Sequence, residues 1–78
     1  MTREEVRQKA EALAEKRAVT RPVVEAWAVD VYLEHLVAQG RMALVGRIST
    51  PLQTAKVLGG HRTELEALGA AIDFASRA

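Results

Sequence analysis

Residue types that could support acid–base or metal chemistry gather in one stretch of the chain. Asp30 and Glu34 are four residues apart and His35 follows directly, so a helix would place the two carboxylates on one face. Such a pair can serve general acid–base catalysis or supply half of a metal site. We favour the alternative, an acidic edge that is solvated or lies at the rim of an interface, because unpaired carboxylates are usually surface residues.

Other catalytic and phosphate-binding patterns are incomplete. Ser49 and Ser76 lack the flanking residues of a nucleophile elbow, and a nucleophile needs a positioned base. Gly59-Gly60 is not followed by the Lys-Ser or Lys-Thr of a P-loop. The chain has no cysteine and only two histidines, which argues against a disulfide or a structural metal. We therefore expect a non-enzymatic protein that uses no cofactor and no metal.

The window from His35 to Thr63 contains no Asp or Glu. Acidic residues flank this window on both sides, whereas its own charged side chains are Arg41, Arg47, Lys56 and Arg62. The formal net charge of +1 conceals this segregation, which favours contact with a polyanion such as the phosphates of duplex DNA. No aromatic residue lies in the window, which disfavours single-strand binding by base stacking. The alternative is that these four side chains are ordinary solvated surface residues without a ligand.

Length and composition predict an all-α protein. Residues 1–78 suffice for a single small helical domain, and the abundance of Ala and Leu together with Glu and Arg favours helices over strands. No apolar run is long enough to span a membrane, and the first residues are charged, so we expect a cytoplasmic protein without a membrane partner. Because a small scaffold without disulfides or metals is often stabilised by oligomerisation, we expect a homo-oligomer.

Capping signals predict three to four short helices. Thr2 and Glu5 form a capping box, so the first helix should run from Arg3 to about Arg17. Thr20 and Pro22 start a second helix, the central apolar one, which continues to Gln39 and ends before Gly40.

The secondary structure of the second half of the chain has more than one interpretation. Segment 41–49 is expected to be irregular or a small hairpin. Thr50-Pro51 opens a further helix, which Gly59-Gly60 interrupts, and Thr63 with Glu66 is a second capping box that opens the last one. A single kinked helix from Pro51 is the alternative.

The helix over 22–39 is apolar on more than half of its circumference. Such a helix must be covered from more than one direction, either by the other helices or by a partner subunit. The residues predicted to form an oligomer or partner interface are Val24, Trp27, Val31, Tyr32 and Leu36.

Residues 53–68 have the spacing of a helix-turn-helix unit. Ala55 is small where two helices would touch, Gly59 suits the turn, and Leu65 and Leu68 return to the inner face. An ordinary helix, glycine turn and helix share this spacing. Glu64 and Glu66 would repel phosphates, so we favour contacts with the DNA backbone over base recognition. The predicted DNA-binding residues are Arg41, Arg47, Lys56, His61 and Arg62.

The order of these segments resembles that of phage small terminase subunits of the P27-like type. Thr20 precedes the segment Val24-Glu25-Ala26-Trp27-Ala28, Gly40 and Gly46 flank the middle segment, and Pro51 opens the next helix. The end, residues 71–77, resembles the closing motif of that family, with Ala71 and Phe74 in place of its glycine and proline.

The resemblance implies an oligomeric, non-enzymatic subunit that engages viral DNA and hands it to a large subunit with ATPase and nuclease activity. Our first hypothesis is therefore a small DNA-associated protein, such as a phage DNA-packaging subunit, that binds double-stranded DNA. The alternative is a helical protein–protein interaction module, such as a phage- or plasmid-encoded inhibitor or adaptor, that docks on a larger protein through an apolar helix face.

Overall fold

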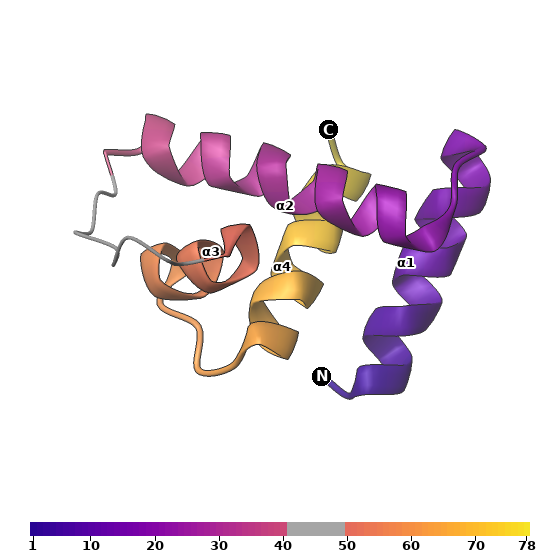
Figure 1. Cartoon of the computed structure of the whole chain (residues 1–78), viewed down its shortest axis with the longest axis horizontal. Helices are drawn as coiled ribbons and strands as arrows, with labels where there is room; N and C mark the ends of the chain where they lie inside the picture. Colours follow the sequence, from indigo (N-terminus) through magenta and orange to yellow (C-terminus); the bar gives the residue numbers. More distant parts are fainter. Residues whose placement is uncertain (41–49) are drawn as a thin grey trace.

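The computed structural model describes residues 1–40 and 50–78, which form four helices (Figure 1). They are α1 (Arg3–Arg17), α2 (Arg21–Ala38), α3 (Pro51–Gly59) and α4 (Glu64–Ser76). The prediction of an all-α fold with several short helices is confirmed. The hairpin predicted at 41–49 lies outside the described residues. No helix of the described part is long and apolar enough to cross a membrane.

Each helix start follows from its local sequence. The Thr2 hydroxyl accepts a hydrogen bond from the Glu5 N–H (3.2 Å), and the Glu5 carboxylate accepts one from the Thr2 N–H (3.1 Å), as a capping box requires. Thr50 and Gln53 form the same pair of bonds at the start of α3. Thr20 is the N-cap of α2 by position only, because its side chain makes no capping bond.

The cap of α4 differs from the predicted box. The Thr63 hydroxyl accepts from the Glu66 N–H at 3.1 Å, as expected. The Glu66 carboxylate, however, accepts from the backbone N–H of Arg62 at 3.0 Å, one residue before the N-cap. It still satisfies a backbone donor at the helix start.

Residues with a left-handed backbone conformation follow three of the helices. Ala18 follows α1 with φ 58°, Gly40 lies beyond the end of α2 with φ 77°, and Gly60 follows α3 with φ 71°. Gly60 stops α3 because a helix cannot continue through a left-handed residue. Residues 51–76 therefore form two helices joined by a short turn, not one kinked helix.

The core lies where α2 and α4 cross. Both helices pack against all the other helices, whereas α1 and α3 lie at opposite ends of the molecule (Figure 1). The fully buried side chains include Val6 of α1, Val24 of α2 and Ile72 of α4. Many of the other core residues are alanines, so the helices can approach closely. The predicted central helix is thus α2, and α4 shares that position.

Candidate functional site

The structure places three of the five predicted DNA-binding residues. Arg41 and Arg47 lie outside the described residues. Lys56 is half-buried on α3, and Arg62 is exposed in the turn between α3 and α4. The His61 side chain turns toward α2, where its Nε2 is 2.7 Å from the Tyr32 hydroxyl. Because that ring nitrogen is engaged inside the fold, Lys56 and Arg62 are the better candidates for phosphate contacts.

The segment α3–turn–α4 has the connectivity of a helix-turn-helix unit but not an exposed second helix. Five residues of α4 are buried, namely Ala67, Gly69, Ala71, Ile72 and Ala75. At its N-terminal end, where a recognition helix contacts bases, the exposed side chains are Glu64 and Glu66. This placement disfavours base recognition by α4.

The predicted interface on α2 divides into buried and half-buried residues. Val24 and Leu36 are only 1% and 2% exposed within this single chain. A partner cannot reach either side chain in this conformation, so these two residues are corrected from interface to core. Trp27, Val31 and Tyr32 are half-buried, and the guanidinium of Arg17 lies 3.8 Å from the centre of the Trp27 ring.

The residues that suggested catalysis do not converge. Asp30 and Glu34 are exposed, and the His35 ring stacks on Phe74 with ring centres 4.4 Å apart. The Ser76 hydroxyl donates to the carbonyl oxygen of Ile72 at 2.7 Å, a bond within its own helix. Within residues 1–40 and 50–78, no three His, Cys, Asp or Glu side chains lie close enough together to hold a metal ion.

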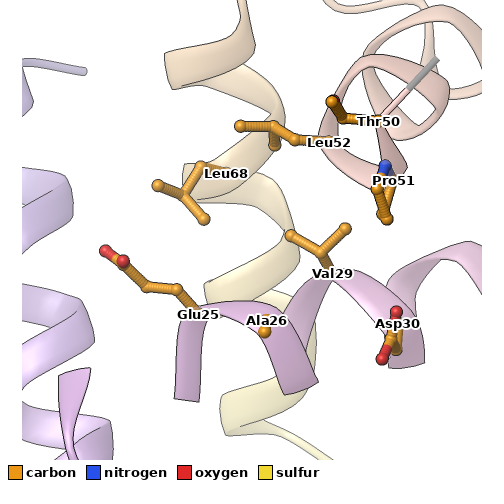
Figure 2. A pocket seen from close by; sticks show the side chains of 8 residues that line it. All are labelled: Glu25, Ala26, Val29, Asp30, Thr50, Pro51, Leu52 and Leu68. Atoms are coloured by element: carbon orange, nitrogen blue, oxygen red, sulfur yellow. The ribbon is translucent and has the colours of Figure 1, made fainter. Parts of the chain in front are cut away.

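An apolar groove lies between α2, the start of α3 and α4, and we call it the α2–α3–α4 groove. It has a volume of about 400 Å³. It is lined by Glu25, Ala26, Val29, Asp30, Thr50, Pro51, Leu52 and Leu68 (Figure 2). Figure 2 shows the side chains of Val29, Leu52 and Leu68 converging on it from three helices. The groove therefore presents a mostly apolar wall made by the tertiary fold.

The charged side chains of this groove are carboxylates on α2. Asp30 is exposed and forms no ion pair within the described segments. Glu25 is half-buried and accepts a hydrogen bond from the guanidinium of Arg21 at 3.0 Å. In Figure 2 the two carboxylates lie at opposite ends of the α2 wall, and that of Glu25 points away from Asp30. The groove can thus bind an apolar group, and the described residues that line it include no nucleophile with a base beside it.

A second hollow, of about 370 Å³, continues along α1. We call it the arginine furrow; it is lined by Arg3, Val6, Arg7, Arg21, Glu25, Leu65 and Leu68. Glu25 and Leu68 line both hollows. The arginine furrow and the α2–α3–α4 groove are therefore neighbours that meet at these two side chains.

Sequence reasoning missed this groove because its walls come from separate segments. Asp30 drew attention only as a possible acid–base or metal residue, Glu25 only as part of the family-like segment 24–28, and Leu68 only as an inner residue of the last helix. Nothing in the local sequence indicates that Leu52 and Val29 face the same hollow. The one available signal is the N-cap at Thr50, since it fixes where Pro51 and Leu52 begin α3.

No protein-family model matches the chain, and no curated protein or solved structure matches it significantly.

Proposed function

We propose that this protein is a non-enzymatic protein–protein interaction module, such as an inhibitor or adaptor, that docks a segment of a larger protein in the α2–α3–α4 groove. The supporting observation is the groove itself, in which the half-buried side chains of Leu52 and Leu68 face one hollow that is also lined by Val29, a core residue that is 5% exposed. Burying these apolar surfaces against a partner is favourable by about 25 cal/mol per Å² of apolar surface. An apolar groove between helices is a common site for a partner's apolar side chains.

The size of the groove fits this role. Sites for compact ligands measure roughly 300–1,000 Å³ and are mostly apolar with a few polar groups, and this groove has about 400 Å³. That volume suits one or two large apolar side chains of a docking segment. The docking surface we propose is thus the groove, and not the α2 surface of Val24, Trp27, Val31, Tyr32 and Leu36 that the sequence suggested.

A matched pair of variants tests the proposal. Peptides are selected from a random phage-display library on the immobilised wild-type protein, and their affinities are measured by fluorescence anisotropy. Ala26 and Ala38 are both exposed on α2, but only Ala26 lines the groove. We expect Ala26→Arg to weaken binding about tenfold or more, which is about 1.4 kcal/mol, and Ala38→Arg to leave it nearly unchanged. Equal effects of the two variants, or a failure to select any peptide, would overturn the proposal.

Contact with duplex DNA is a second candidate function. Residues 50–63 contain Lys56 and Arg62 but no acid, which supports phosphate contacts by a homo-oligomer such as a phage packaging subunit. If this hypothesis is right, the affinity for duplex DNA falls steeply as the salt concentration rises. The affinity is also lower in each of four variants, Arg41→Ala, Arg47→Ala, Lys56→Ala and Arg62→Ala. Micromolar protein that leaves duplex DNA unshifted at low salt would exclude it. Light scattering tests the homo-oligomer, which a monomeric mass would contradict.

A further inference from the structure

The α2–α3–α4 groove and the arginine furrow lie next to each other, and we call the two together the depression. Glu25 and Leu68 belong to the linings of both hollows. Together the two hollows extend from the first turn of α3, across α4, to the first turns of α1. A partner segment anchored beside Leu68 would continue into one of the two ends.

Charge is distributed unevenly along this depression. The end beside α3 carries the exposed carboxylate of Asp30, and the middle holds Leu68 together with the carboxylate of Glu25, which is paired with Arg21. The other end carries three guanidinium groups, those of Arg3, Arg7 and Arg21. One end is therefore acidic and the opposite end is basic.

The arginines at the basic end are only partly neutralised by the protein. Arg21 is paired with Glu25 at 3.0 Å. Arg7 has a looser contact with Glu11, at 3.6 Å between exposed side chains, which contributes little in water. Arg3 forms no ion pair with any described residue. Because Arg3 and Arg7 are one helical turn apart, their like charges repel each other unless an anion lies between them.

We propose that the docking segment carries an apolar side chain followed by an acidic residue, Asp or Glu. The apolar side chain fills the groove beside Leu68, and the carboxylate binds the guanidinium groups of Arg3 and Arg7. Arginine forms strong charge-assisted and often bidentate hydrogen bonds with carboxylates, so this end recognises an acid and rejects a basic residue. This inference rests on the proposed docking function and specifies its partner.

Charge variants that preserve the fold test the inference. Arg3 is the first residue of α1, where an acidic side chain is favourable to the helix, so Arg3→Glu reverses the charge without harming the helix. Arg77 is exposed at the other end of the chain and lines neither hollow. Arg77→Glu therefore makes the same change in net charge and serves as the control.

The readout is the composition and affinity of the peptides selected on the wild-type protein. We expect an Asp or Glu at a fixed spacing from an apolar residue, a loss of affinity of about fivefold or more in Arg3→Glu, and less than about twofold in Arg77→Glu. A peptide in which the acid is replaced by its amide should bind Arg3→Glu and wild type alike. Peptides that are sensitive to Ala26→Arg but contain no enriched acid, and that ignore Arg3→Glu, would overturn this inference and leave the docking function standing. Peptides that ignore Ala26→Arg would overturn both.

Discussion

Gly59 and Gly60 should tolerate alanine differently, for two separate reasons. At Gly59 an added Cβ would lie 2.6 Å from the His61 Nε2 and 2.9 Å from the Tyr32 hydroxyl oxygen. These are the two atoms of the hydrogen bond that joins the α3–α4 turn to α2. At Gly60 an added Cβ meets nothing within 4 Å, but φ is 71°. Space therefore limits the first position and backbone conformation limits the second.

The magnitude of the Gly59 effect is a balance of two terms. Alanine is favoured over glycine in a helix by about 0.5–1 kcal/mol. Against this, the added Cβ disrupts the Tyr32–His61 hydrogen bond, which costs about 0.5–1.5 kcal/mol. It also disturbs the packing of these two rings, whose centres are 5.8 Å apart, at a cost of about 0.5–1.5 kcal/mol. We expect Gly59→Ala to lower the free energy of unfolding by about 1 kcal/mol.

A double-mutant cycle with His61→Ala tests this reasoning. Without the imidazole, the close contact that remains for the Cβ at position 59 is the Tyr32 hydroxyl at 2.9 Å, which is the end of a side chain that has lost its His61 partner and can shift. Gly59→Ala should then stabilise the protein by at most about 0.5 kcal/mol. Gly60→Ala should cost about 1 kcal/mol with or without His61, because a left-handed residue disfavours a side chain in both cases. The free energies come from urea denaturation followed by circular dichroism. An effect of Gly59→Ala that is the same in both backgrounds would refute the account.

Three further outcomes follow from the packing and the caps. Ile72→Val should lower the free energy of unfolding by about 1 kcal/mol in urea denaturation, because Ile72 is completely buried. Lys9→Gln should cost less than about 1 kcal/mol, and less still at high salt, because the 3.0 Å pair with Asp73 is partly exposed. Hydrogen bonds with the Thr2 backbone and hydroxyl lower the pKa of Glu5. The Glu5 carboxylate therefore stabilises the folded protein above its ordinary pKa, and this contribution is lost as the pH falls through the lowered pKa. Glu5→Gln should abolish this part of the pH dependence of stability in an acid titration followed by circular dichroism.

The helices could be predicted from the sequence because their limits are set by local contacts. Thr2 and Glu5 are three residues apart, and Gly60 needs only its own backbone conformation to end α3. Such contacts operate over one helical turn, so a short window of sequence contains all the information they need.

The surfaces could not be predicted in the same way. Val24 and Leu36 were predicted to form an interface, yet both are buried within this chain, in which α2 packs against α1, α3 and α4. Likewise, His61 was assigned to DNA, but its partner Tyr32 is 29 positions away. The groove depends on Val29, Leu52 and Leu68 meeting across three helices. These contacts follow from tertiary packing, which single-sequence periodicity does not specify.

The central claim, that the α2–α3–α4 groove docks a partner segment, is tested most directly by mapping where a selected peptide binds. The measurement is a titration of ¹⁵N-labelled protein followed by two-dimensional NMR. We expect the largest shift changes at Ala26, Val29, Leu52 and Leu68, which line the groove. Shift changes confined to Lys56 and Arg62, or to the surface around Trp27, would contradict it.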